Sequence, residues 1–512
     1  MKINWKIFIA MILILLAGYL TAFALTKRAT ALTTFDNIMS EDTAQIARNT
    51  VNGNFFTTKY VTPASYAYFP YLENHPDYIR YPFIILLYAF LFLFAPQSAA
   101  TIKIFNGFLF LINGMLIFLI ALNLLARKKD SDIPHQIRNW LAALAAIFVS
   151  FIIEDYFRYA LSDAYEIPTI TVLLLLILVV SHGKAPALAG ALQAVLYLCR
   201  PNMVVFAPFI WIYLAIGKET FKEKLRVTLI FSGAFVFILA PFLVRNMILT
   251  GKVMFSYQQL FELYKNATAD HNELYNNFSI AQPLFPITRA LLSSLYHKFL
   301  EEVVKPFIFA SQPEYWLGWI GIPFFFLRFK NERRLLLLIL LSLITHIVVF
   351  SLYLQLDRVY VPLFFLASIF GYLGVFEWII SIILKRWEPA RGASQNMLIL
   401  LLFIFCAACF TVVHPRRPER DNRARPPSAE AVAVLQQYDL DCVYSNNPYW
   451  IAWYADIVAI YKPTHEEDIF TKGPENCRYF IVDERKPYPN SFLRKYGIMV
   501  DKGEDYSLFI LN

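Results

Sequence analysis

Carboxylates and arginines gather in short polar stretches that each adjoin an apolar run of this sequence. The stretch SEDTAQIARNTVNGNFFTTKY, residues 40–60, carries the acids Glu41 and Asp42, and Asp36 precedes them. A carboxylate can take a proton from a hydroxyl group or bind a divalent metal ion. An arginine grips a phosphate through a forked set of donors, which suits this ligand better than lysine does. These residue types together predict chemistry that joins a hydroxyl group and a phosphate.

Five further segments contain the same residue types: Glu73, His75, Asp77 and Arg80 in ENHPDYIRYPF; Asp163 in EDYFRYALSDAYEIP; Arg200 in LCRPNM; Arg245 in PFLVRN; and Arg358 with Tyr360 in QLDRVYVP. Each residue alone fits a helix cap, an interfacial anchor or a solvated loop charge. Convergence of six segments on one face of a membrane would instead favour a site, so the topology decides between these interpretations.

The composition indicates a membrane protein with many spans. Of the 512 residues, 58% are hydrophobic and 16% are charged, whereas soluble domains contain about 25% charged residues. Aromatic residues reach 17%, which suits membrane helices with interfacial belts. The net charge of +8 lies in short clusters between apolar runs, as in cytoplasmic loops. We therefore expect membrane lipids as partners and no nucleic acid.

About eleven apolar runs approach the length of about 20 residues with which a helix crosses a bilayer. They cover roughly residues 7–25, 102–126, 139–154, 165–181, 184–199, 203–217, 226–244, 304–327, 333–355, 359–383 and 396–413. Lys2 and Lys6 precede the first run. This pattern predicts an uncleaved anchor in the inner membrane with the N-terminus in the cytoplasm.

The run PFIILLYAFLFLFAPQ, residues 82–97, decides on which side every later loop lies. If it crossed the bilayer, the basic cluster at 127–129 would lie outside, and each later cluster would change sides. We therefore predict an interfacial or re-entrant hairpin, which places five basic loops in the cytoplasm. The first outer loop, 27–101, and the long outer loop, 246–303, then share the outer face with the other acid-rich segments. All six chemistry-bearing segments converge there.

The chain beyond residue 413 differs from the membrane part. The basic, proline-rich stretch HPRRPERDNRARPP is a linker at 414–427, and residues 428–512 predict a small extracytoplasmic α/β domain. SAEAVAVLQQY is an amphipathic helix, and DCVYS, IVAIY, RYFIVDE and YSLFILN are buried strands. Cys442 and Cys477 lie on or beside these strands and could form a disulfide. The expected fold is mainly α and polytopic, with residues 1–413 as its catalytic membrane domain.

Six motifs, in order over roughly residues 5–385, resemble those of GT-C-fold glycosyltransferases. That group contains protein O-mannosyltransferases, lipid A aminoarabinose transferases and rhizobial lipopolysaccharide-core transferases. The motifs here are EDTAQIARNTVNGNFF, HPDYIRYPFIILLYAF, YFRYALSDAYEIP, LCRPNM, PFLVRNMILTGK and LDRVYVP. Two positions depart from the family pattern: threonine and alanine follow Asp42 where an aromatic residue is usual nearby, and Asp77 replaces a proline. Asp36, Glu41 and Asp42 therefore all stay candidates for the catalytic acid.

The resemblance implies an inverting transferase of the outer face. Its donor would be a polyprenyl-phosphate-linked sugar, and its acceptor a cell-envelope glycan, lipid or protein. The implied roles are a base at Asp42, or else Glu41 or Asp36; phosphate binding by Arg245 with Arg200 or Arg358, and by Arg80; and acceptor binding or support by Asp163, Glu73, His75, Asp77 and Tyr360. No cofactor is required, although a divalent cation, Mg²⁺ or Mn²⁺, could bind Asp42 and Asp163.

Two other classes of protein remain as alternatives. An O-antigen ligase or polymerase would concentrate its arginines in one large late outer loop, whereas here the first loop holds the acidic motif. A lipid or solute transporter would carry ionisable residues near mid-membrane, in repeated halves. The predicted spans are nearly uncharged, with His346 as the main exception, and no repeat is evident.

Overall fold

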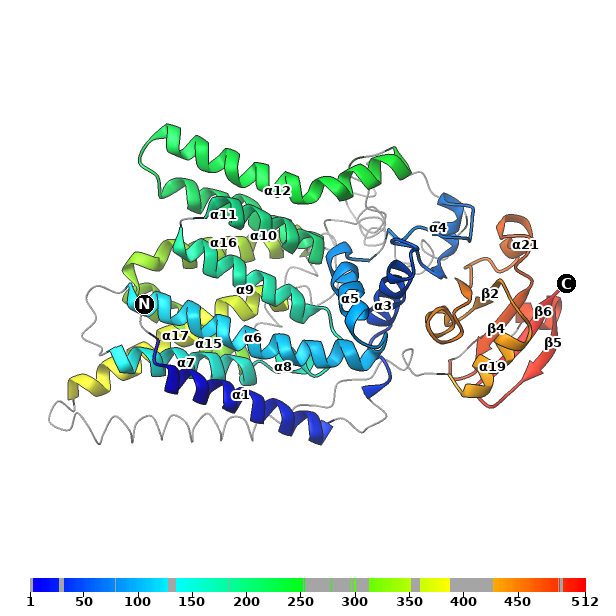
Figure 1. The fold of residues 1–512 in the computed structure, drawn as a ribbon, viewed down its shortest axis with the longest axis horizontal. Coiled ribbons are helices and arrows are strands. Elements are labelled where there is room, and N and C mark those ends of the chain that lie inside the picture. Colours follow the sequence, from blue (N-terminus) through cyan, green and yellow to red (C-terminus); the bar gives the residue numbers. More distant parts are fainter. Residues whose placement is uncertain are drawn as a thin grey trace. The chain divides into compact units, whose positions relative to one another are not determined.

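The computed structural model describes residues 3–26, 32–78, 80–127, 135–183, 185–251, 253, 278, 296, 299–300, 313–350, 360–386, 427–486, 488 and 491–512. The chain divides into two compact units. The first unit comprises Met1–Lys27, Lys103–Phe255 and Phe299–Pro418, and the second comprises Arg28–Ile102, Ser256–Lys298 and Glu419–Asn512. Figure 1 shows the elements of both.

Helices make up the described part of the first unit. They are α1 (Trp5–Thr26), α6 (Ala99–Ala126), α7 (His135–Ile152), α8 (Glu154–Ala160), α9 (Glu166–His182), α10 (Pro186–Cys199), η1 (Pro201–Val205), α11 (Phe206–Ile216), α12 (Phe221–Thr250), α15 (Pro313–Arg328), η2 (Lys330–Glu332), α16 (Arg333–Phe350) and α17 (Val361–Arg386). Their axes run roughly along one direction (Figure 1), as expected for apolar helices that pack side by side.

Four helices among the described residues are long and apolar enough to cross a membrane: Trp5–Ala24, Ala99–Ala126, Phe221–Thr250 and Val361–Ile382. A fifth results if α7 and α8, bent by 81° at their junction, form one broken span. The other apolar helices are shorter, and the predicted span 396–413 lies outside the described residues. The expected count of about eleven spans is therefore not established, although the membrane character is.

Close backbone contact joins α15 to α17. A side chain on Gly321 would collide with the carbonyl oxygen of Gly371, and a side chain on Gly371 would collide with that of Gly318. Small residues at a helix interface allow such an approach, and lipid-embedded helices depend on this packing because lipid tails are as apolar as leucine.

The second unit combines helices with one six-stranded sheet. Its helices are α3 (Ile38–Val51), α4 (Pro63–Tyr68), α5 (Pro82–Phe94), α19 (Ala429–Gln437), α20 (Pro448–Trp450), η6 (Ile451–Ala455), α21 (Asp468–Lys472) and α22 (Ser491–Tyr496). Its strands are β1 (Tyr60–Val61), β2 (Cys442–Ser445), β3 (Val458–Tyr461), β4 (Tyr479–Asp483), β5 (Gly497–Lys502) and β6 (Tyr506–Leu511), in the order β1-β3-β2-β4-β6-β5.

The sheet is parallel from β1 to β4 and antiparallel from β4 to β5. The predicted helix at 428–438 and all four predicted strands are present. The sequence pattern missed β5, and it missed β1, in which Tyr60 pairs with Ala459 and Val61 with Ile460. A strand of two residues is too short to show alternation, so only its partner reveals it. The sheet thus includes a piece of the predicted first outer loop.

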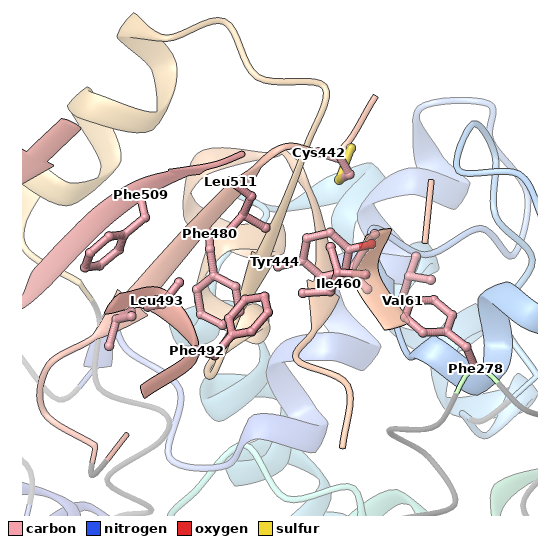
Figure 2. Packing of buried hydrophobic residues seen from close by; sticks show 13 residues of the cluster. Val61, Phe278, Cys442, Tyr444, Ile460, Phe480, Phe492, Leu493, Phe509 and Leu511 are labelled. Atoms are coloured by element: carbon pink, nitrogen blue, oxygen red, sulfur yellow. A yellow bond between two sulfur atoms is a disulfide. The ribbon is translucent and has the colours of Figure 1, made fainter. Parts of the chain in front are cut away.

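Hydrophobic residues fill both faces of this sheet. On one face, α19 and η6 pack against alternate strand residues such as Val443 and Ile481. On the other face, Val61, Tyr444 and Phe480 form a cluster with Phe492 of α22 (Figure 2). A disulfide between cysteines 442 and 477, whose Cα atoms are 5.4 Å apart, closes 35 residues of chain beside that cluster.

The run at 82–97 forms one helix, α5, so the re-entrant form of the expected hairpin is wrong. That the run lies along the interface stays a prediction. Pro82 opens the helix at its first turn, and the helix ends at Ala95, directly before Pro96. No glycine or proline lies between them, so nothing in the run reverses the chain. Thirteen residues span about 20 Å, which is less than the hydrocarbon thickness of about 30 Å.

Candidate functional site

The helix α3 is polar and yet buried. The side chain of Asn37 caps its start by accepting a hydrogen bond from the Met39 N–H, and Gly53, with a φ of 96°, follows its end. Its buried residues include Glu41 and Asp42. Because burial of a polar group is costly without a hydrogen-bonding partner, such a helix must find its partners in neighbouring segments.

Two extended segments supply these partners. The Lys59 N–H donates to Gln45 Oε1 at 3.0 Å, and Asn49 Nδ2 donates to the Thr57 carbonyl at 3.1 Å. The segment around Thr57 in turn forms an antiparallel bridge with Pro76, and the Thr58 N–H donates to the His75 carbonyl at 2.8 Å. The bridge brings the HPDYIRYP stretch onto α3.

The bridge sets Arg80 against Asp42. The Arg80 Nε donates to Asp42 Oδ2, and both side chains are almost completely buried. The Arg80 backbone N–H donates to Asp77 Oδ2 at 3.2 Å. Three predicted site residues from two motifs therefore meet in one place in the second unit: an acid, an arginine and a second acid.

Burial raises the pKa of the Asp42 carboxyl to about 6, the Arg80 charge lowers it in part, and the Asp77 charge adds to the rise. Burial alone would lower the pKa of Arg80, but the Asp42 charge more than offsets this effect and holds that pKa above its usual range. A carboxylate with a pKa near neutral suits proton transfer at physiological pH. The arginine beside it stays charged.

Two tyrosines, Tyr60 of β1 and Tyr449 of α20, lie close to this pair. Their ring centroids are 4.3 Å apart, and the Tyr449 hydroxyl donates to the Tyr60 hydroxyl at 3.1 Å. Burial raises the pKa of both hydroxyls, and the charges of Asp42 and Arg80 act on both. Tyr449 comes from the C-terminal segment, so that segment contributes to the surroundings of the first-loop acid.

The other predicted residues of the first loop are placed differently. His75 is buried, and its ring nitrogens contact Ser65 Oγ at 2.5 Å and the Tyr71 carbonyl at 2.9 Å. Burial lowers the pKa of His75 to about 4, so its neutral ring holds the loop together. Glu73 is exposed, Asp36 is partly exposed just before the cap of α3, and Glu41 is buried.

Beside Glu41, a network of polar side chains lies at the carboxyl ends of β2 and β4. Asn447 Nδ2 donates to Asp483 Oδ2 at 2.7 Å, and Arg485 Nε donates to Asp483 Oδ1 at 2.7 Å. Burial alone would lower the pKa of Arg485, but Asp483 raises it overall, and the Glu41 charge adds to the rise. Glu41 of α3 thus lies near the edge at which open α/β sheets usually bind ligands.

In the first unit, Asp163 lies in the turn between α8 and α9. Its Oδ2 is 4.0 Å from Lys103 Nζ of α6, and both side chains are fully buried. Asn106 of α6 donates to the carbonyls of Ser162 and Ala164 at 2.8 and 2.9 Å. These contacts fix the YFRYALSDA motif on α6.

Arg200 lies at the end of α10, where it forms a buried ion pair with Glu166 of α9. Asn202 Nδ2 is 3.3 Å from His346 Nε2 of α16. Tyr360 packs edge-on against the same histidine, with ring centroids 5.6 Å apart. The LCRPNM motif and the start of α17 therefore meet at one end of these helices.

The remaining predicted residues are Arg245 and Arg358. Arg245 is partly exposed and lies five residues before the end of α12 at Thr250. Arg358 lies outside the described residues. Within the described ranges, no group of three or more His, Cys, Asp or Glu side chains could hold a metal ion.

The argument that the predicted spans are nearly uncharged, with His346 as the main exception, needs correction. Buried ionisable side chains include Lys103 of α6, Glu166 of α9 and Glu377 of α17. Glu377 lies 3.7 Å from Arg328 of α15. Lys103 is a residue that sequence reasoning missed, and its position in the apolar run AATIKIF was a sufficient signal.

Tyr60 and Tyr449 were missed as well. Tyr449 follows Asn446-Asn447-Pro448, the stretch directly after a buried strand. A carboxyl end of a parallel strand is a usual place for a ligand site, so the position of Tyr449 carried a signal. Tyr60 carried none, because β1 is visible only through its pairing with β3.

Comparisons with known proteins show the fold. No family model and no curated protein matches the sequence. ArnT from Cupriavidus metallidurans bound to undecaprenyl phosphate is similar in structure, with a TM-score of 0.56, 11% identity and 97% of each chain covered. The apo state of the same protein gives a TM-score of 0.54 and 12% identity, again over 97% of each chain. The predicted GT-C fold, which ArnT represents, is thereby confirmed.

Proposed function

We propose that this membrane protein is a glycosyltransferase that moves a sugar from a polyprenyl phosphate to a hydroxyl group of an extracytoplasmic acceptor. The observation that carries the proposal is Asp42, which lies buried on the polar helix α3 and pairs with Arg80. The chain that holds it shares its fold with a protein crystallised with undecaprenyl phosphate. The acceptor would be a cell-envelope glycan, lipid or protein.

In this reaction Asp42 takes the proton of the acceptor hydroxyl as the oxygen attacks the anomeric carbon of the donor sugar. The bond between that carbon and the phosphate oxygen breaks, and polyprenyl phosphate leaves with the electron pair. Attack on the face opposite the leaving group inverts the configuration at the anomeric carbon. A correctly placed base contributes about 10²- to 10⁴-fold to the rate.

The leaving phosphate gathers negative charge and needs a cation. Arg245 is our first candidate for this role, because the residue is partly exposed and apolar helix precedes it. Arg200 is buried and paired with Glu166, so binding a phosphate would require it to leave that partner. Arg358 stays a second candidate.

Arg80 has a different role in this proposal, which is to orient the base. Its Nε holds one oxygen of Asp42, and its charge keeps the pKa of that carboxyl from rising further. Asp77 and Asp163 are assigned to the acceptor, with Tyr360 and Glu73 as auxiliary groups. No metal ion is assigned.

We place the reaction on the outer face of the inner membrane, with the N-terminus in the cytoplasm. Residues 1–413 then form the membrane domain and 428–512 the extracytoplasmic domain. The pairing of β1 with β3 requires the first loop and the C-terminal segment to share one side, because one sheet cannot have strands on both sides of a bilayer. That this shared side is the outer one follows from the charge pattern of the loops.

The direct test is an assay of the purified protein with a panel of polyprenyl-phosphate sugars. The proposal predicts release of polyprenyl phosphate that depends on an acceptor hydroxyl compound. Absence of release with every donor and acceptor in the panel would contradict it.

A transporter is the alternative that one observation favours. Buried charges such as Lys103 with Asp163 are typical of solute pathways through a membrane. Lys103, however, is the fifth residue of α6 and Glu166 is the first residue of α9, so both lie away from the middle of those helices. In proteoliposomes, movement of an intact lipid-linked sugar without cleavage would favour the transporter.

A further inference from the structure

Arg48 is the one basic residue of the EDTAQIARNTVNGNFF motif, and the proposed reaction leaves it without a role. It lies on α3, six residues after Asp42. Its Nη1 donates to the Trp453 carbonyl at 2.8 Å, and its Nη2 donates to the Ala452 carbonyl at 3.0 Å and to Asp456 Oδ1 at 2.9 Å. The guanidinium also lies over the Trp453 ring, 4.5 Å from its centroid.

These acceptors form the C-terminal end of η6, where carbonyl groups lack partners within the helix. A cation commonly binds such carbonyls. The fork of a guanidinium can reach two carbonyls and a carboxylate at once, whereas a lysine ammonium is a compact point charge. The Arg48 side chain is only 17% exposed, so the contact is more than a surface ion pair.

Lys59, beside β1, adds to the same connection. Its Nζ donates to the Asp456 carbonyl at 2.6 Å and lies 2.7 Å from Asp456 Oδ2. The Ala459 N–H donates to the Lys59 carbonyl at 2.7 Å. Asp456 thus receives cations from two elements of the first loop, at the point where the chain passes from η6 into β3.

The segment held in this way lies near the candidate base, since the Asp42 charge acts on the Tyr449 hydroxyl. Residues 449–456 begin with Tyr449, whose ring stacks near Tyr60 at 4.3 Å, and Phe35 packs edge-on against Trp453 at 5.1 Å. Asp42 is 3% exposed in this arrangement. If the segment moved away from α3, water would reach the carboxylate and its pairing with Arg80 would loosen.

We propose that Arg48 is a positioning residue for Asp42, because it fastens α3 to residues 449–456 of the C-terminal segment. The inference rests on the proposed function for its kinetic consequence. The inference also makes the C-terminal segment part of the framework of the site. The sequence alone predicted only a separate small domain there.

The test compares Arg48→Ala and Arg48→Lys with Arg494→Ala, which removes an exposed arginine of α22 in the same unit. Hydrogen–deuterium exchange is followed over residues 38–51. Labelling of Asp42 by a water-soluble carbodiimide is followed by mass spectrometry. We expect faster exchange and faster labelling in Arg48→Ala, an intermediate result in Arg48→Lys, and no change in Arg494→Ala.

Kinetics use the polyprenyl-phosphate sugar that the donor panel identifies. Misplacement of a reacting group costs up to about 100-fold in rate, so kcat of Arg48→Ala should fall by roughly 10- to 100-fold. KM for the donor should stay within about twofold, because uniform substrate binding is not affected. Partial recovery in Arg48→Lys is expected.

Unchanged exchange and labelling in Arg48→Ala would overturn the inference, since Arg48 would then not be what holds α3 to residues 449–456. Faster exchange with an unchanged kcat would overturn the positioning role. If the wild-type protein cleaves no donor, the proposed function fails separately. Labelling of Asp42 then still decides whether Arg48 keeps the carboxylate covered.

Discussion

Asp42 is a buried acid whose surroundings differ from those of an ordinary surface carboxylate. It is buried, paired with Arg80 and raised in pKa to about 6, whereas Asp36 is partly exposed. Asp42→Asn keeps the shape of the side chain but removes its ability to accept a proton. We expect a loss of about 10²- to 10⁴-fold in turnover with unchanged protein abundance.

Matched variants make this experiment specific. Asp36→Asn and Glu41→Gln should keep most activity, and Asp468→Asn, which changes a partly exposed acid of α21, should keep all of it. Wild-type activity in all three first-loop variants would rule out base catalysis by this loop.

The pH dependence of turnover should report the same carboxyl group. A base works in its ionised form, so the rate should rise with pH through about 6, the pKa of Asp42. Arg80→Gln removes a charge that lowers this pKa, so the rise should move to higher pH. A rise at the same pH in wild type and Arg80→Gln would show that another group controls the rate.

The same pKa has a consequence for stability. Because the pKa of Asp42 is higher in the folded protein than its ordinary 3.8, folding favours the protonated form. The stabilisation of the folded protein by the Asp42 carboxyl group is therefore fully present below about pH 4, and it is lost as the pH rises through about 6.

Arg245 can be tested by geometry as well as by charge. Arg245→Lys keeps the charge and the long apolar stem but loses the planar fork. Loss of one contact to a developing phosphate charge costs about 2–4 kcal/mol, or roughly 30- to 1,000-fold in rate. We expect Arg245→Lys to lose most activity and Arg245→Ala to lose more, with normal expression. Wild-type turnover in the lysine variant would make Arg245 an interfacial anchor and would direct attention to Arg200 or Arg358.

At the scale of elements, the contact between α15 and α17 depends on glycines. Gly371→Leu would push a side chain into the backbone of α15, and overpacking of this kind costs about 1–3 kcal/mol. The measurement is thermal unfolding in detergent. Gly233→Leu on α12 is the control, because no atom lies within 4 Å of the position of its Cβ. Equal melting temperatures of the two variants would contradict the close approach.

The elements around Asp42 show how much the sequence could predict. The place of the EDTAQIARN stretch after an apolar run predicted an acidic site there. The run at 82–97 was predicted not to cross, but its shape as a single helix was missed. The pairing of Asp42 with Arg80 was not predicted, because Thr57 and Pro76 bring them together through an isolated bridge that leaves no periodic pattern.

At the scale of the molecule, topology is the prediction on which the outer-face site depends. If residues 82–97 do not cross the membrane, a reporter fused after Lys129 should lie in the cytoplasm, and one fused after Ile248 should lie outside. The basic clusters between apolar runs are the reason for this expectation. The reverse pair of results would place the acidic segments on the cytoplasmic side and would overturn the outer-face proposal.

What the sequence determined by itself is what hydropathy and local pattern encode. The long apolar runs specify a membrane protein, the order of six motifs indicates the GT-C fold, and strand-like runs predict most of the C-terminal sheet. The apolar and strand-like runs are readable because each depends on residues within about 20 positions of one another. The GT-C fold was indicated instead by the resemblance of the six motifs to those of a known family.

Only the tertiary structure decided which distant residues meet. Asp42 and Arg80 are 38 positions apart, Tyr60 and Tyr449 are 389 apart, and Arg48 and Trp453 are 405 apart. Each partner is chosen by shape, burial and the need to satisfy polar groups in a packed interior. No local signal specifies such a choice, so a buried acid inside a framework shared by the first loop and the C-terminal segment could be found only in the folded chain.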